Sequence, residues 1–162
     1  MLVGSVGLEV VVRPDIDLEI YTDAPAVRDG FAVVSAMAEL PHVRGIRYKD
    51  ARDQAEQGLY WKLVYELTPD QTWGIDMWMF DRSGSMPSAA PRVAAIRAAL
   101  TEDARDTILA IKEEATARGE RANGHWLYRG VLNEGITTYA DYLAWLGDQD
   151  VWARVDWEPV RK

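Results

Sequence analysis

Hydrophobic and polar side chains alternate strictly over residues 15–20. Because successive side chains of a strand point to opposite faces of a sheet, this pattern predicts a strand with one aliphatic and one acidic face. The acidic face carries Asp15, Asp17 and Glu19. Like charges this close raise each other's pKa unless a cation lies among them, and Mg²⁺ prefers such hard oxygen ligands. The strand is therefore a candidate metal-binding strand, and the alternative is an acidic edge strand that faces water.

Alternation along the next part of the chain predicts three further strands, at 43–52, 59–67 and 72–80, the last two joined as a hairpin through a turn at 68–71. In strand 59–67, one face would carry Trp61, Leu63, Tyr65 and Leu67. Apolar residues at three- and four-residue spacing predict helices at 26–40, 92–100, 101–118, 125–133 and 139–146. The first of these contains Gly30, which lowers its helix propensity slightly. Together the patterns predict an α+β fold, a small mixed sheet with flanking helices, followed by a helical C-terminal part.

A loop at 81–88 is the clearest boundary in the sequence, because Gly, Ser and Pro gather there between two regular patterns. We therefore expect a core of residues 1–85 and a helical region of residues 86–162 packed on it. The acidic and basic side chains are also distributed unevenly between the two halves of the chain. Residues 1–81 hold 14 acidic and 7 basic side chains, whereas residues 82–162 hold 12 and 11.

The net charge of −8 makes the chain a poor candidate for binding nucleic acid, which depends on Lys and Arg side chains that neutralise phosphates. Cysteine is absent, which excludes disulfides, thiolate catalysis and Cys-ligated metal. The sequence has no apolar run long enough to span a membrane and no pattern of a signal peptide. These features favour a cytoplasmic location and partners other than a membrane.

Asp76 is a further candidate for chemistry because it interrupts the otherwise apolar strand 72–80. A carboxylate in such surroundings is costly unless it is paired or bound to metal. The alternative is an aspartate at a sheet edge that faces solvent. Glu66, on the preceding strand, is the reserve candidate.

The order Gly4-Ser5, nine residues, then Asp15-Ile16-Asp17-Leu18 resembles the signature of the nucleotidyltransferase superfamily, which has the polymerase-β-like fold. The resemblance covers roughly residues 1–80. It implies that Gly4 and Ser5 bind the phosphates of a nucleotide, and that Asp15 and Asp17 bind two Mg²⁺ ions. In that family a third acidic residue from a later strand completes the metal site, and Asp76 is the best candidate for it.

The resemblance implies metal-dependent transfer of a nucleotidyl group from ATP or another nucleoside triphosphate to a hydroxyl of a small molecule or a protein. Asp76 would hold the second ion or act as a general base. Four basic residues on the strands could clamp the triphosphate or could form a solvated strand face: Arg44, Arg47, Lys49 and Lys62.

The chain departs from the family pattern in three ways, and two of them, the missing arginines and the short N-terminus, support a second hypothesis. Many relatives have arginines after Gly-Ser, where this chain has residues 6–9 without one, and many have a serine where this chain has Pro14. Most have a helix and a full strand before Gly-Ser, where only residues 1–3 precede Gly4. The alternative is a catalytically inactive nucleotidyltransferase-like domain that binds a nucleotide or a protein. A third possibility is an unrelated α+β domain, which predicts that Asp15, Asp17 and Asp76 do not converge in space.

Overall fold

The computed structural model of the chain describes residues 1–85, 88–151 and 157–160, and it is α+β. The chain divides into two compact units. The first comprises residues 1–7 and 13–90, and the second comprises residues 8–12 and 91–162. The five-residue segment Leu8–Val12 therefore belongs to the second unit although it lies between two parts of the first.

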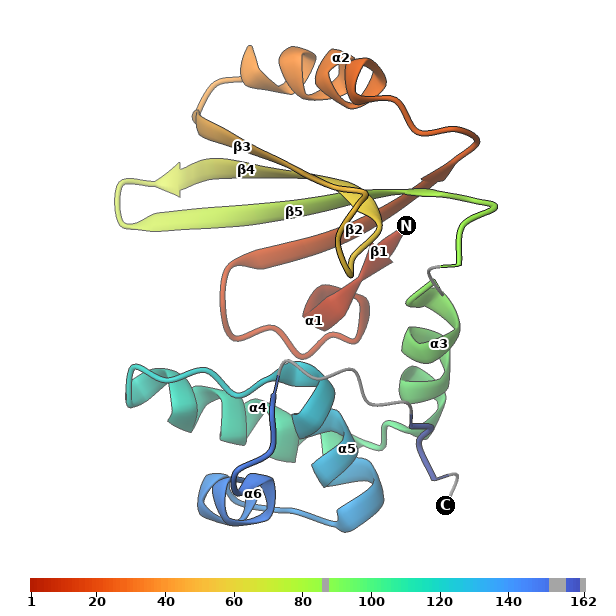
Figure 1. Cartoon of the computed structure of the whole chain (residues 1–162). Helices are drawn as coiled ribbons and strands as arrows, with labels where there is room; N and C mark the ends of the chain where they lie inside the picture. The colour runs from red at the N-terminus through yellow and green to blue at the C-terminus, as the bar shows by residue number, and fades with distance from the viewer. Residues whose placement is uncertain (86–87, 152–156, 161–162) are drawn as a thin grey trace. The chain divides into compact units, whose positions relative to one another are not determined.

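The first unit is built on a mixed sheet, whose described strands run in the order β1-β2-β5-β4-β3. Only the pairing of β2 with β5 is parallel among them, and the other neighbours are antiparallel. The strands are β1 (Leu2–Val3), β2 (Asp15–Thr22), β3 (Val43–Ala51), β4 (Gly58–Thr68) and β5 (Gln71–Asp81). The short helical turn α1 (Gly4–Gly7) joins β1 to the segment that precedes β2. The topology thus brings β2 beside β5, two strands that are far apart in the sequence (Figure 1).

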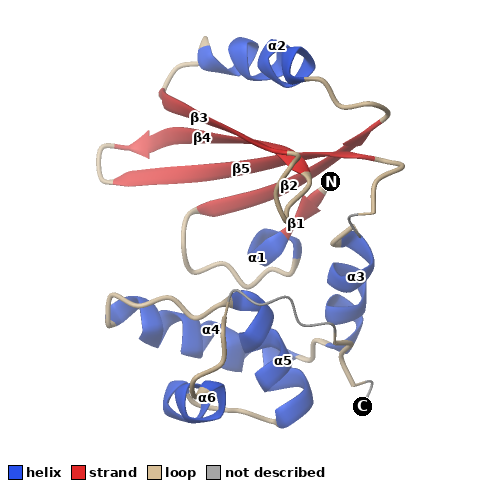
Figure 2. Ribbon diagram, in the orientation of Figure 1, coloured by secondary structure: helices blue, strands red, loops and turns tan. Residues whose placement is uncertain are grey.

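One face of this sheet is aliphatic and packs against α2 (Val27–Ala38), which lies along the sheet in Figure 2. The core between them contains the buried side chains Val34, Leu59, Trp61, Leu63, Met77 and Met79. The opposite face carries the residues in between, among them the aspartates of β2 and β5. Alternation along each strand therefore places the aspartates on the face of the sheet opposite this hydrophobic core.

The second unit contains most of α3 (Ala90–Ala99), together with α4 (Glu102–Ala117), α5 (Gly124–Glu134) and α6 (Tyr139–Leu146). Leu8 and Val10 are buried in its core with side chains of these helices. Two side chains of α4 also donate hydrogen bonds to the backbone of the segment Leu8–Val12. Arg105 donates to the carbonyl oxygen of Leu8 and Lys112 to that of Val10, each at 2.8 Å. Among the described residues, no helix combines the length and the apolar composition needed to cross a bilayer.

The structure confirms the predicted α+β class and the four strands and five helices, with ends shifted by a few residues. It corrects three details. Gly4 and Ser5, for which the sequence suggests a small tight turn, begin one helical turn, and Leu2–Val3 forms a short strand that pairs with β2. Leu67 does not continue the buried face of β4, because a register shift between Glu66 and Thr68 precedes the turn and leaves it 52% exposed.

Candidate metal centre

Three carboxylates meet at the centre of the polar face of the sheet. Asp15 and Asp17 project from the same side of β2, two residues apart, and Asp76 projects from β5. In the parallel pairing of these strands, Asp17 is the register partner of Asp76. One carboxylate oxygen from each of the three lies within 4.8 Å of the others. The structure therefore brings together the three aspartates that the sequence singles out, whereas an unrelated domain with a chance motif is expected to keep them apart.

Two glycines leave room for these carboxylates. Gly4 has a φ of +62°, and a Cβ on it would overlap the carboxylate of Asp17. A Cβ on Gly74 would lie 2.8 Å from Oδ1 of Asp15 and 2.9 Å from Nζ of Lys62. Gly4 of the Gly4-Ser5 turn thus lies against the side chain of Asp17.

Asp76 already accepts two hydrogen bonds from neighbouring β4. The ammonium group of Lys62 donates to Oδ2 at 2.9 Å, and the hydroxyl of Tyr60 donates to Oδ1. The Lys62 Nζ also lies 3.6 Å from Oδ1 of Asp15, so it bridges two of the three carboxylates. All three side chains are partly buried, with Lys62 30% exposed, Asp15 27% and Asp76 14%. Water therefore screens these charges only in part.

The charges of the cluster change the acidity of its donors. Burial raises the pKa of the Tyr60 hydroxyl, and so do its hydrogen bond to Asp76 and the negative charge there. Burial by itself lowers the pKa of Lys62, but Asp76 and Asp15 outweigh it and raise that pKa overall. At neutral pH, Tyr60 is therefore a neutral hydrogen-bond donor and Lys62 is a cation.

The other candidates lie outside the cluster. Glu66 accepts two hydrogen bonds from the guanidinium of Arg44, each 2.9 Å long, and is not among the three grouped carboxylates. Lys49 pairs with Glu56 at 2.9 Å. The sequence offers Lys62 as a phosphate clamp or as part of a solvated strand face, and it does not single out Tyr60. Their two-residue spacing on β4 places both toward the face that carries Asp76, but only the β4–β5 register identifies their partner.

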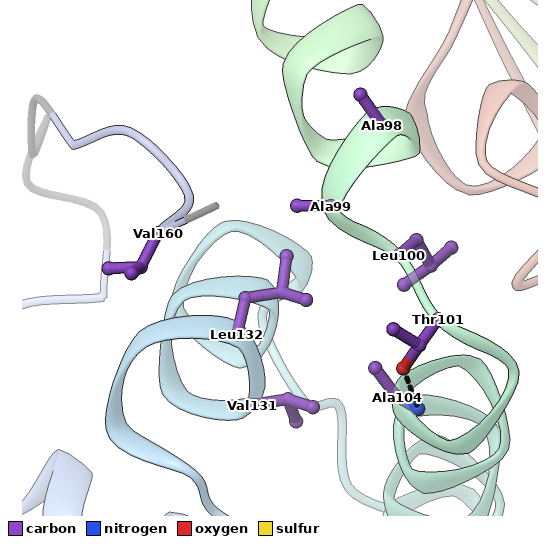
Figure 3. Close-up of a pocket in the computed structure, with 8 residues that line it drawn as sticks. All are labelled: Ala98, Ala99, Leu100, Thr101, Ala104, Val131, Leu132 and Val160. Carbon is purple, nitrogen blue, oxygen red and sulfur yellow. Dashed lines mark hydrogen bonds between the residues drawn. The ribbon is translucent and has the colours of Figure 1, made fainter. Parts of the chain in front are cut away.

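A separate cavity of about 290 Å³ lies within the second unit (Figure 3). The side chains that line it are apolar apart from that of Thr101, whose hydroxyl oxygen accepts a hydrogen bond from the amide of Ala104 at the start of α4. The lining residues are Ala98, Ala99, Leu100, Thr101, Ala104, Val131, Leu132 and Val160. None of the described residues that line this cavity is titratable, so the cluster of aspartates remains the candidate site for chemistry.

Comparison of the chain with protein-family models, with curated proteins and with solved structures finds no match. The resemblance to nucleotidyltransferases therefore rests on the motif and on the geometry of the residues that form it.

Proposed function

We propose that this protein transfers a nucleotidyl group, with the help of divalent metal, from ATP or another nucleoside triphosphate to a hydroxyl group. The observation that carries the proposal is the approach of Asp15, Asp17 and Asp76 to within 4.8 Å beside the Gly4-Ser5 turn. Both parts of the Gly-Ser…Asp-x-Asp motif thus meet at one place. The net charge of −8 favours a small molecule or a protein as the acceptor over nucleic acid.

The residues present fit a magnesium site. Carboxylate oxygens are the hard ligands that Mg²⁺ prefers, and one oxygen from each of Asp15, Asp17 and Asp76 lies within 4.8 Å of the others. When bound, Mg²⁺ would neutralise charge on the phosphates and lower the pKa of the attacking hydroxyl. By resemblance, Asp15 and Asp17 are ligands of two ions, and Asp76 is a ligand of the second ion or the general base.

The proposed reaction is an in-line displacement at the α-phosphorus of the nucleotide. The acceptor oxygen forms a bond to this phosphorus, and the bond from phosphorus to the leaving pyrophosphate breaks. The hydroxyl proton passes to a carboxylate of the cluster, for which Asp76 is the candidate. The backbone at Gly4 and Ser5 would hold the phosphates next to Asp17.

Isothermal titration calorimetry with ATP and with GTP, in the presence of Mg²⁺ and in EDTA, tests this proposal. We expect wild-type protein to bind nucleotide only with metal, and Asp15→Asn and Asp17→Asn to lose this binding. Asp70→Asn is the matched control, because it removes the same charge from the exposed turn between β4 and β5. Absence of nucleotide binding by the wild type at millimolar concentration would contradict the proposal.

A second candidate is an inactive nucleotidyltransferase-like domain that binds a nucleotide or a protein. The observation that favours it is the state of Asp76, both of whose oxygens accept hydrogen bonds from β4. This candidate predicts nucleotide binding that persists in EDTA or is absent altogether. Metal-dependent binding that is lost in Asp76→Asn would argue against it.

A further inference from the structure

We propose that Lys62 occupies the place of one cation in the carboxylate cluster, so that the site accepts one divalent ion rather than two. The inference rests on the proposed function, since it concerns how the same three aspartates bind metal. It makes Lys62 a positioning residue that limits the number of metal ions.

The ammonium group of Lys62 lies close to two of the three carboxylates, those of Asp76 and Asp15. Lys62 on β4 is the register partner of Asp76 on β5, and Asp76 is in turn the register partner of Asp17 on β2. Its Nζ lies 2.9 Å from Asp76 and 3.6 Å from Asp15. A second ion that bridged these two carboxylates would need the same space. Because a divalent ion and an ammonium group repel each other, Lys62 would have to leave before that ion bound.

A glycine on β5, Gly74, leaves room for the side chain of Lys62. Gly74 on β5 is the register partner of Asp15 on one side and of Val64 on the other. A Cβ at residue 74 would lie 2.9 Å from Nζ of Lys62 and 2.8 Å from Oδ1 of Asp15. Any larger residue would therefore crowd the contact between Lys62 and Asp15. Gly74 permits the ammonium group to reach both strands.

Lys62 also offsets part of the negative charge of the three aspartates. Three ionised carboxylates carry a charge of −3, and Lys62 reduces it to −2, which a single divalent ion balances. Tyr60 adds a hydrogen bond to the remaining oxygen of Asp76 without adding charge. Both oxygens of Asp76 therefore accept hydrogen bonds from β4, which disfavours a second ion at this carboxylate.

Counting bound Mn²⁺ by electron paramagnetic resonance tests the inference on the full-length protein without any nucleotide. We expect one Mn²⁺ per chain in the wild type and two in Lys62→Gln. Lys49→Gln is the matched control, because it removes the same charge from Lys49 on neighbouring β3, which pairs with Glu56 instead. It should bind one ion. Lys62→Met, which keeps the apolar stem, provides a second variant if Lys62→Gln does not give a native circular dichroism spectrum.

The outcomes separate the two proposals. Two ions in the wild type, or one ion in both Lys62 variants, would overturn the inference and leave a metal-dependent function in place. No ion in the wild type without nucleotide would overturn the inference, whereas the proposed function would still be decided by the calorimetric titration with nucleotide and Mg²⁺. Two ions in Lys49→Gln would show that a change of net charge is sufficient, and this too would overturn the specific role of Lys62.

Discussion

The carboxylate of Asp17 lies against the backbone of Gly4, in the space that a Cβ on residue 4 would fill. Gly4 also has a left-handed backbone, with a φ of +62°. The glycine of the Gly-Ser turn and the second aspartate of the Asp-x-Asp strand therefore depend on each other sterically. This relationship gives a physical reason for glycine at that position.

We expect Gly4→Ala to lower the free energy of unfolding and to weaken metal binding. A left-handed alanine costs about 1 kcal/mol, and displacement of Asp17 adds to this cost. Gly119→Ala is the control, since Gly119 has a φ of +73° but a Cβ on it would meet no other atom within 4 Å, so it measures the backbone cost alone. Urea unfolding and Mn²⁺ titration measure the two effects. Equal losses of stability and unchanged Mn²⁺ affinity in both variants would contradict the steric argument.

We expect Asp17→Asn to abolish the stabilisation of the protein by Mg²⁺. The substitution keeps the shape of the side chain but removes one of the three carboxylates that lie within 4.8 Å of one another. Carboxylate oxygens are the ligands by which a protein usually holds Mg²⁺, and a neutral amide does not replace their charge. Thermal unfolding in EDTA and in Mg²⁺ measures the effect. An equal rise of the melting temperature with Mg²⁺ in the variant and in the wild type would contradict the prediction.

We expect Gly30→Ala to destabilise the protein, although alanine is the better helix former. In an exposed helix interior this change stabilises by about 1 kcal/mol. Here a Cβ on Gly30 would overlap the indole ring of Trp61, which is 1% exposed in the core between α2 and the sheet. Overpacking of this kind costs about 1–3 kcal/mol. Ser35→Ala on the exposed side of α2 is the control, and urea unfolding should show a small gain or no change for it.

We expect the stability of the protein to fall between pH 10 and pH 12, partly because of Tyr139. Burial raises the pKa of Tyr139 to about 12, with a further contribution from its hydrogen bond to Glu120. In the unfolded chain this hydroxyl ionises near pH 10, so in this range the folded state holds a proton that the unfolded state has lost. The free energy of unfolding therefore decreases as the pH rises, by at most about 1.4 kcal/mol per pH unit for one group.

Tyr139→Phe should make this decline shallower. Chemical unfolding at pH 9, 10 and 11 gives the slope for the wild type and the variant. Because Tyr60 is also shifted upward, part of the decline should remain. An unchanged slope in Tyr139→Phe would contradict the assignment.

The sequence predicts the parts of the fold that depend on local chemistry. Thr101 and Thr138 mark helix starts in the sequence, and each accepts a hydrogen bond from the amide three residues later, at 3.2 Å and 3.1 Å. The strict alternation at 15–20 likewise predicts β2 and its acidic face. These features follow from backbone hydrogen bonding and from side-chain periodicity, which a single sequence carries.

The sequence does not reveal the features that depend on the pairing of distant segments. The bridging position of Lys62 follows from the register of β4 on β5, which no local pattern specifies. The helical turn at Gly4–Gly7 is likewise set by its neighbours and not by helix propensity. Leu8 and Val10 belong to the core of the second unit, where Arg105 and Lys112 bind their carbonyl oxygens. Asp76 stands out in the sequence only because an isolated carboxylate in an apolar strand is costly.

The segment Leu8–Val12 has a consequence for how the protein can be divided. The Gly-Ser part of the motif precedes it and the Asp-x-Asp part follows it, while Leu8 and Val10 are buried in the second unit. A fragment that stops at residue 90 would leave these two side chains without the core that buries them. A proteolytic cut in the loop at 81–88 would leave Leu8 and Val10 of the N-terminal fragment buried in the core of the second unit. The two fragments would therefore stay associated after the cut. The residues between the two parts of the motif thus include a segment that belongs to the helical unit, and we expect that this unit cannot be removed without loss of that segment's packing.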